Sequence, residues 1–388
     1  MRDWRRFTPI LVLFLALRLM MLATFLPGDL TRFGDYPYYY SLARFSDDGH
    51  LPFIHYWSEH LPVFPFISIA VYRLAHLVSS GSYETYVYLF GGLMVAFDTG
   101  SLYLFLRLAR RLWGQEQALQ LGWTYSALFI PLIFCWWTFE GMTAFFILLA
   151  LYLLLEGRER GSAVAVGLGA MTKLVPLLIL PAVVRTRPSR RWLPYVLVVG
   201  IVMVAVAGPL LYLGTPYAVA SFRSVAARGS YQTVWALIDG NLGTGLLGAA
   251  TDHFDLAKAT APSDHPARVP EWLKTGLFGL LSLFIFLKAD LRENSRRLVA
   301  FICLTLVIFL LWSKGWSPQW QVFLFPLLLL SLPYRRSLLF VLALSGISLA
   351  EWPVLLSRGM NEWLYLTVPL RTGLFVLLAV ELWRRARV

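Results

Sequence analysis

The sequence is poor in charge and in cysteine. Only 14% of its 388 residues are charged, whereas 58% are hydrophobic; an average soluble domain has about 25% charged residues. The two cysteines, Cys135 and Cys303, both lie inside apolar runs, so no disulfide framework is expected. So low a charged fraction is not typical of a water-soluble protein. The composition therefore predicts an integral membrane protein.

The net charge of +12 does not indicate a nucleic-acid partner, because most basic residues gather at short turns between apolar runs. This distribution follows the positive-inside rule, which places these turns and both chain ends in the cytoplasm. The basic clusters are Arg2/Arg5/Arg6, Arg107/Arg110/Arg111, Arg158/Arg160, Arg185/Arg187/Arg190/Arg191, Lys288/Arg292/Arg296/Arg297, Arg335/Arg336 and Arg384/Arg385/Arg387.

The apolar runs predict an all-α, polytopic protein with about 12 transmembrane helices in a single domain over 1–388. Residues 61–78 are expected to form an interfacial or re-entrant helix, because a crossing there would place two basic clusters outside. Residues 163–184 are expected to form a hairpin of two short helices that turns near 172–176. Single crossings are expected over 8–26, 84–106, 119–138, 140–155, 193–213, 272–289, 298–313, 319–333, 337–357 and 363–383.

This topology leaves two long segments on the extracytoplasmic side, residues 27–80 and residues 214–271. The first is expected to carry amphipathic helices along the membrane surface. All six histidines of the chain fall in these two segments. Any chemistry is therefore expected on the outer face.

Asp35 opens an aromatic-rich stretch of the first outer segment, in Gly34-Asp35-Tyr36-Pro37. A carboxylate held there and partly desolvated suits proton abstraction from a hydroxyl. The alternative is that Asp35 only caps a short helix. His55, Glu59 and His60 could suggest a metal site, since His55 and Glu59 have the i, i+4 spacing of ligands on a helix, but prolines flank the segment. They are interpreted as polar loop residues, and no metal is expected.

Lys173 and Lys314 lie at polar breaks in apolar runs, each beside glycine or proline. Cations inside a membrane are costly, so such residues usually mark a site or an anionic partner. The alternative is that both lysines extend to lipid headgroups. If they bind a lipid-linked phosphate, Arg223 or Arg228 is a candidate third contact. Arg18 and Asp98 are interpreted as structural, and Glu140 as a neighbour of the same cavity.

Taken together, these residues resemble the GT-C superfamily of membrane glycosyltransferases, especially its polyprenyl-phosphate-mannose-dependent members. The resemblance runs from about residue 8 to residue 333 and rests on an ordered set of four segments. These are Gly34-Asp35 with Tyr39, Ala43, Gly49, Pro52, Glu59 and Pro62; Arg110-Arg111-Leu112-Trp113-Gly114; Gly167 to Lys173 with Pro176 and Pro181; and Ser317-Pro318-Gln319-Trp320 with Pro326.

The resemblance implies transfer of one sugar, mannose by this likeness, from a polyprenyl-phosphate donor to a hydroxyl on a lipid or glycan acceptor. It implies Asp35 as the general base, with Asp29 as the alternative. Lys173, Lys314 and Arg228 would bind the donor phosphate without a cofactor. Residues expected to contact substrate are Glu59, His60, Tyr231, Gln319 and Trp320.

Two other functions fit the same composition. A flippase or transporter of lipid-linked sugars would use the same cations, although transporters often show internal repeats and none is evident here. A non-catalytic subunit of GT-C type would tolerate replacement of Asp35. Both alternatives stay open at the level of sequence.

Overall fold

The computed structural model describes residues 5–245, 248–261, 264–291 and 294–387. All regular secondary structure in these described residues is helical, so the expected all-α class is confirmed. Arg2 and Arg292 of the predicted basic clusters lie outside the described residues.

The chain divides into two compact units. Unit 1 comprises Met1–Leu177, Pro194–Ala226 and Gly248–Thr260, and unit 2 comprises Leu178–Leu193, Ala227–Leu247 and Ala261–Val388. The sequence alone predicts one domain with outer segments 27–80 and 214–271, and these boundaries stay predictions. Residues 248–260, which are distant in sequence from the start of the chain, thus belong to the same unit as the first outer segment.

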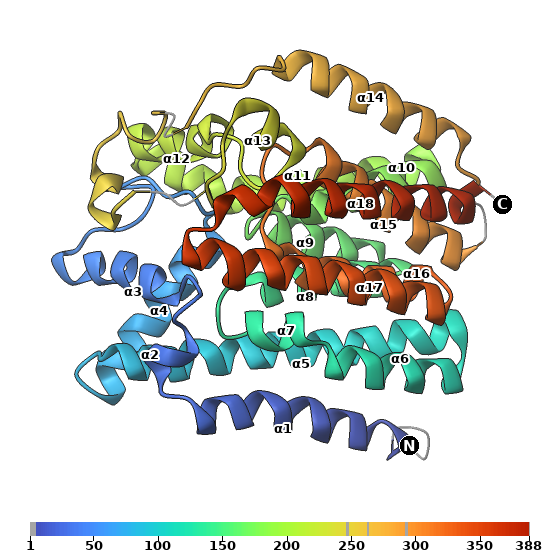
Figure 1. Cartoon of the computed structure of the whole chain (residues 1–388), viewed down its shortest axis with the longest axis horizontal. Coiled ribbons are helices and arrows are strands. Elements are labelled where there is room, and N and C mark those ends of the chain that lie inside the picture. The colour runs from blue at the N-terminus through green and yellow to red at the C-terminus, as the bar shows by residue number, and fades with distance from the viewer. Residues whose placement is uncertain (1–4, 246–247, 262–263, 292–293, 388) are drawn as a thin grey trace. The chain divides into compact units, whose positions relative to one another are not determined.

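Unit 1 is a set of helices packed around one long helix. They are α1 (Thr8–Thr24), α2 (Pro27–Leu30), α3 (Tyr36–Arg44), α4 (Val63–Val78), α5 (Tyr83–Trp113), α6 (Gln115–Ala127), α7 (Phe129–Phe134), α8 (Glu140–Leu155), α9 (Glu159–Ala170), α11 (Ser189–Leu213) from Pro194 onward, and α12 (Thr215–Ala227). The long helix, α5, contacts α1, α4, α6 and α8, and α8 packs against α9 (Figure 1).

Two boundaries in unit 1 differ from the sequence prediction. α5 continues to Trp113, because Arg107, Arg110 and Arg111 are good helix formers and the helix ends only at Gly114, with φ of 87°. The single helix expected over 119–138 is broken at Leu128, which is extended. Pro131 explains the break, since its ring would clash with the carbonyl of residue 127 in a continuous helix.

Residues 163–184 are interrupted where the sequence predicts a turn. α9 ends at Ala170, and a 3-10 turn over Val175–Ile179 precedes α10 (Leu180–Thr186). The interruption places Lys173 outside regular helix, with its amide donating a 2.9 Å hydrogen bond to the Gly169 carbonyl.

Unit 2 has a fully buried helix at its centre. Its helices are α10, α13 (Val234–Asp239), α14 (Glu271–Lys288), α15 (Ser295–Trp312), α16 (Gln321–Ser331), α17 (Tyr334–Leu349) and α18 (Leu364–Arg387). All 11 residues of α16 are buried, as expected for a helix that is apolar on every side. α15 contacts α14, α16 and α18, and α17 contacts α16 and α18 (Figure 1).

Five helices of the described residues are long and apolar enough to cross a membrane. They are Tyr83–Trp113, Ser189–Leu213, Ser295–Trp312, Tyr334–Arg358 and Asn361–Arg387. Five shorter apolar helices have between 10 and 17 residues, among them α1 and α4. The expected total of about 12 crossings stays a prediction, as does the interfacial position of α4.

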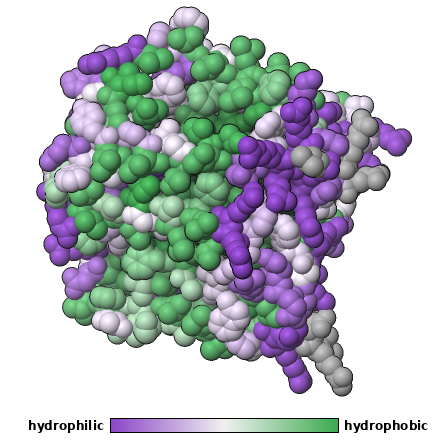
Figure 2. Space-filling view, turned by 45° about the vertical axis from the view of Figure 1, so that its right-hand side comes forward, coloured by the Kyte–Doolittle hydropathy of each residue, from purple (hydrophilic) through white to green (hydrophobic). Residues whose placement is uncertain are grey.

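Large apolar side chains are exposed along some of these helices. Leu197 and Val204 of α11 are 63% and 69% exposed, and Leu280 of α14 is 69% exposed. Figure 2 shows a face of the molecule on which hydrophobic residues cover a broad area. So large an apolar surface is unfavourable in water, and lipid is the solvent that suits it.

Candidate active site

Asp35 precedes α3, where the backbone lies against the segment before α8. Its amide donates a 2.7 Å hydrogen bond to the carbonyl oxygen of Trp137. A Cβ on Gly34 would lie 2.4 Å from the Trp137 Cα, so this approach requires glycine. The Asp35 carboxylate makes no capping hydrogen bond to α3. The interpretation of Asp35 as a simple helix cap is therefore wrong.

The Asp35 carboxylate lies in the field of three charged side chains of unit 1: Glu59, Glu140 and Lys173. Burial is the largest influence and raises the pKa of Asp35 to about 6. A 3.2 Å hydrogen bond from the Tyr39 hydroxyl lowers this pKa, and so does the charge of Lys173. The negative charges of Glu140 and Glu59 raise it. A pKa of about 6 makes Asp35 more basic than an ordinary carboxylate and leaves most of it ionised at neutral pH.

Glu140 begins α8 with its side chain fully buried. Its carboxylate Oε1 accepts a hydrogen bond from the Lys173 ammonium, which remains 22% exposed. The other oxygen, Oε2, has no hydrogen-bond partner among the described residues. Lys173 is expected from sequence to bind a phosphate; in the structure it pairs with Glu140, the residue expected to face the same cavity.

Glu59 and His60, the expected substrate contacts of the first outer segment, lie in the same group. Glu59 Oε1 is 3.5 Å from His60 Nε2, and Glu59 Oε2 is 3.4 Å from Nε2 of His253. The His60 ring packs edge-on against Tyr39, with 5.6 Å between ring centroids. The structure therefore brings together Asp35, Glu59, His60, Glu140 and Lys173. We call these five residues the carboxylate cluster.

His55 does not join the carboxylate cluster through its ring nitrogen, since Nδ1 accepts a hydrogen bond from the Leu51 amide at 3.0 Å. Within the described ranges, no group of three or more His, Cys, Asp or Glu side chains is arranged to hold a metal ion. Asp29, the alternative base, is exposed on α2.

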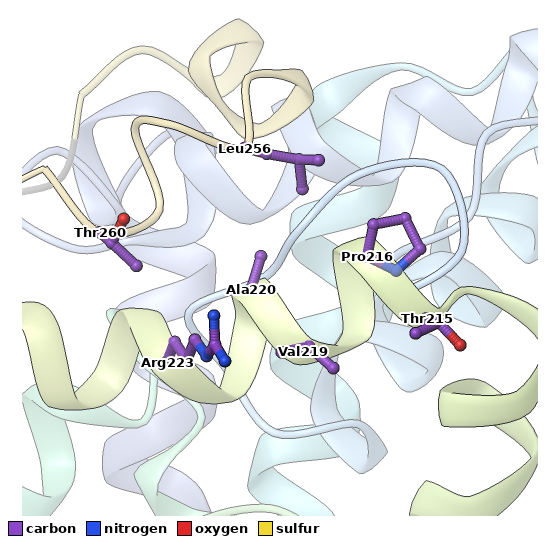
Figure 3. A pocket seen from close by; sticks show the side chains of 7 residues that line it. All are labelled: Thr215, Pro216, Val219, Ala220, Arg223, Leu256 and Thr260. Atoms are coloured by element: carbon purple, nitrogen blue, oxygen red, sulfur yellow. The ribbon is translucent and has the colours of Figure 1, made fainter.

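A separate cavity of about 340 Å³ lies between α12 and the segment that follows the 3-10 turn Ala250–Phe254 (Figure 3). Arg223 lies at this cavity, whereas Arg228, the other candidate third cation, belongs to unit 2. The cavity is lined by Thr215, Pro216, Val219, Ala220, Arg223, Leu256 and Thr260.

In unit 2, the candidate residues surround Tyr231. The Tyr231 amide donates to the Lys314 carbonyl at 3.0 Å, and the Trp316 amide donates to the Tyr231 carbonyl at 3.1 Å. A Cβ on Gly315 would lie 2.4 Å from the Tyr231 ring. The Arg228 guanidinium lies 5.6 Å from the centroid of the same ring. The structure thus brings together Tyr231, Lys314 and Arg228.

Two acidic side chains, Glu271 and Asp239, and two cationic ones, Lys274 and Arg228, act on Lys314. Burial lowers the pKa of the Lys314 ammonium most; Glu271 opposes this effect, while Lys274 and Arg228 lower the pKa further. Lys274, which the sequence analysis does not single out, is 3% exposed and pairs with Glu271 at 2.8 Å.

Gln319 and Trp320 follow in a 3-10 turn, Pro318–Trp320. The Trp320 ring packs near Trp316 and Phe309, with centroid separations of 6.0 and 6.4 Å. Both residues thus belong to unit 2 with Lys314, and their contact with sugar or phosphate stays a prediction.

Each unit also contains a buried ion pair. Arg18 and Asp98, interpreted from sequence as structural, pair at 3.0 Å in unit 1. In unit 2, Arg371, which was not expected from sequence, donates hydrogen bonds to the Glu351 carboxylate and to the Gln232 carbonyl beside Tyr231. A charged residue inside each of two apolar runs is the signal that would have indicated this second pair.

Comparison with known proteins identifies one matching family. The model of glycosyltransferase family 87 matches residues 62–313 of this chain. A search of curated proteins finds no match.

Two solved structures are similar to this chain at low identity. The Archaeoglobus fulgidus oligosaccharyltransferase in its apo form has a TM-score of 0.48 and 13% identity, over 99% of this chain and 56% of that chain. This chain therefore spans little more than half the length of that enzyme. ArnT from Cupriavidus metallidurans, bound to undecaprenyl phosphate, has a TM-score of 0.49 and 14% identity, over 96% of this chain and 76% of that one.

Proposed function

The chain belongs to glycosyltransferase family 87, and from that premise we propose that it transfers one sugar, with inversion, from a polyprenyl-phosphate donor to a hydroxyl acceptor. The proposed sugar is mannose, and the proposed acceptor is a lipid or a glycan. The distribution of basic residues supports a reaction on the extracytoplasmic face of the cell membrane, with both chain ends in the cytoplasm.

Asp35 is the proposed general base. It takes the proton of the acceptor hydroxyl while the hydroxyl oxygen forms a bond to the anomeric carbon. The bond from that carbon to the phosphate oxygen breaks on the opposite face, and the polyprenyl phosphate leaves. A single displacement of this kind inverts the anomeric centre. The observation that carries the proposal is the half-buried, non-capping Asp35 carboxylate beside Tyr39, Glu59, Glu140 and Lys173.

Cationic side chains are proposed to stabilise the negative charge that grows on the departing phosphate. In unit 2, Lys314 and Arg228 around Tyr231 support this role. In unit 1, the Lys173 ammonium is partly exposed beside the paired Glu140 and is proposed for the same role. Because cations support a monophosphate leaving group, the proposal includes no metal and no cofactor.

The experiment measures radiolabelled sugar transfer from synthetic polyprenyl-phosphate-mannose to a membrane lipid extract, with and without EDTA. Wild type is compared with Asp35→Asn and with Asp29→Asn, a matched change at an exposed carboxylate. We expect Asp35→Asn to lose about 10²–10⁴-fold in rate, because that is the usual contribution of a general base. Asp29→Asn and EDTA are expected to leave transfer near the wild-type rate.

Equal transfer by wild type and Asp35→Asn would refute Asp35 as the base, and loss in Asp29→Asn alone would transfer that role to Asp29. If wild type moves no label to any acceptor or to water, the donor is wrong. Movement of labelled donor across vesicle membranes without transfer would then favour the flippase.

A further inference from the structure

Gln232 has an unusual backbone conformation next to Tyr231. Its φ is 50°, in the left-handed region that a residue with a side chain rarely adopts. Such a conformation costs free energy, so surrounding contacts are needed to maintain it. The side-chain oxygen Oε1 does not provide one, because it is buried and has no hydrogen-bond partner among the described residues. The contacts made by the backbone are therefore the ones to consider.

The residues on either side of Gln232 hold the same carbonyl group. The Tyr231 amide donates a 3.0 Å hydrogen bond to the Lys314 carbonyl oxygen, and the Thr233 hydroxyl donates a 2.9 Å hydrogen bond to the same atom. A carbonyl oxygen has two lone pairs, so it can accept from both donors. Residues 231–233 thus fix the backbone at Lys314, and we call this segment the carbonyl clamp.

Arg371 of α18 holds the central residue of the carbonyl clamp. Its guanidinium donates one hydrogen bond to the Gln232 carbonyl oxygen and another to the Glu351 carboxylate, in the π-helix Ala350–Leu355. The guanidinium also lies 4.9 Å from the centroid of the Trp316 ring. Both members of the ion pair are buried within unit 2. Arg371 therefore connects Glu351 to the carbonyl clamp.

The geometry of this ion pair matters more than its contribution to stability. Desolvation of two buried charges offsets most of their attraction, so a buried pair alone is weak evidence of a stabilising role. A guanidinium, however, carries its donors in a rigid, planar arrangement. With one donor held by Glu351, another is directed at the carbonyl oxygen of the left-handed residue. The pair is thus suited to maintaining one backbone conformation.

We propose that Arg371, held by Glu351, is a positioning residue that maintains the left-handed conformation of Gln232. Through the carbonyl clamp, it places Lys314 for the phosphate of the donor. The inference rests on the proposed role of Lys314 in binding that phosphate. Arg371 acts on the donor only through the clamp, so its loss should change donor binding without removing a group that contacts the donor.

The first test replaces the ion pair by apolar side chains, in Arg371→Met/Glu351→Leu, so that neither charge is left buried alone. We expect KM for synthetic polyprenyl-phosphate-mannose to rise about tenfold, with little change in melting temperature. A purely structural role would lower the melting temperature and the amount of active protein but leave KM unchanged. The matched control is Arg336→Gln/Glu381→Gln, which removes a more exposed pair between α17 and α18 and should keep the wild-type KM.

Gln232→Gly tests the conformational step directly. Glycine adopts a φ of 50° at little cost, so it does not need the guanidinium to hold it there. In the Arg371→Met/Glu351→Leu background, Gln232→Gly should return KM to the value of Gln232→Gly alone. Gln232→Ala also removes the side chain but keeps the unfavourable conformation, so it should give no rescue. Rescue by both substitutions, or by neither, would overturn the proposal.

Hydrogen exchange tests the carbonyl clamp without an activity assay. The Tyr231 amide donates to the Lys314 carbonyl, so its protection should fall about tenfold or more in Arg371→Met/Glu351→Leu and return with Gln232→Gly. Mass spectrometry of the purified, donor-free protein measures this, and unchanged protection would refute the proposal even if no sugar is transferred. If protection falls but Lys314→Met keeps the wild-type KM, the clamp stands and the proposed role of Lys314 is wrong.

Discussion

The Lys173 ammonium donates a hydrogen bond to the Glu140 carboxylate, which is fully buried at the start of α8. The two residues lie 33 positions apart, so their hydrogen bond joins the segment after α9 to the start of α8. Lys173, which is expected from sequence to bind the donor phosphate, is also the cation whose charge lowers the pKa of Asp35. The first consequence of the pair concerns stability.

Lys173→Met should lower the free energy of unfolding by about 3 kcal/mol, because the buried Glu140 carboxylate is left without its cation. Adding Glu140→Gln should restore most of the loss, since the uncompensated charge is then removed. Thermal unfolding in detergent measures both variants. Glu116→Gln is the control, because it breaks an exposed pair with Arg6 and should cost less than about 1 kcal/mol. Equal costs for the two single variants would contradict the buried-pair argument.

Transfer should fall as pH drops through about 6, the raised pKa of Asp35. The active form of a base is the ionised one, and a raised pKa brings its protonation closer to neutral pH. The measurement is kcat/KM for the labelled donor against pH. The folded chain holds this proton more tightly than the unfolded chain, so the stability that protonated Asp35 contributes is lost as pH rises from 3.8 to about 6. Asp35→Asn should therefore unfold no earlier than wild type at neutral pH, which separates lost chemistry from lost fold.

Gly34→Ala should reduce both activity and stability. The new Cβ would lie 2.4 Å from the Trp137 Cα, and a backbone atom cannot move aside as a flexible side chain does. Steric conflict of this kind costs about 1–3 kcal/mol and displaces Asp35. Gly28→Ala is the matched control, because its Cβ would meet no atom within 4 Å. Transfer rates and melting temperatures of both variants test this, and equal behaviour would show that Gly34 is not constrained.

Lys314→Arg should extend activity to higher pH. The pKa of Lys314 is lowered, chiefly by burial, so the wild-type ammonium loses its proton earlier than an ordinary lysine. If the ammonium binds the donor phosphate, KM for the donor should rise on the alkaline side in wild type. A guanidinium stays charged there, so the rise should be absent in Lys314→Arg. A KM that rises equally in both proteins would indicate a different titrating group.

The sequence alone predicts helix positions well, because apolar runs and breaks are local properties. Four expected crossings match helices of the structure to within a few residues: 140–155, 193–213, 272–289 and 298–313. The breaks at Lys173 and Lys314 are also local, since each needs only polar residues beside glycine or proline. The break at Leu128 is local too: Pro131 is visible in the sequence, and a prediction from hydropathy alone misses it.

The partners of these residues are decided by tertiary structure. Asp35 is marked by sequence, but its backbone hydrogen bond to Trp137 and the neighbouring charge of Glu140 come from residues distant in the chain. Tyr38 and His253 meet across 215 positions, and no periodicity relates them. Composition and local pattern determined that the chain is a membrane-embedded, all-helical protein with candidate charged side chains at the breaks between its apolar runs. Which carboxylate meets which cation depended on packing between distant segments, because electrostatic interaction acts through space rather than along the sequence.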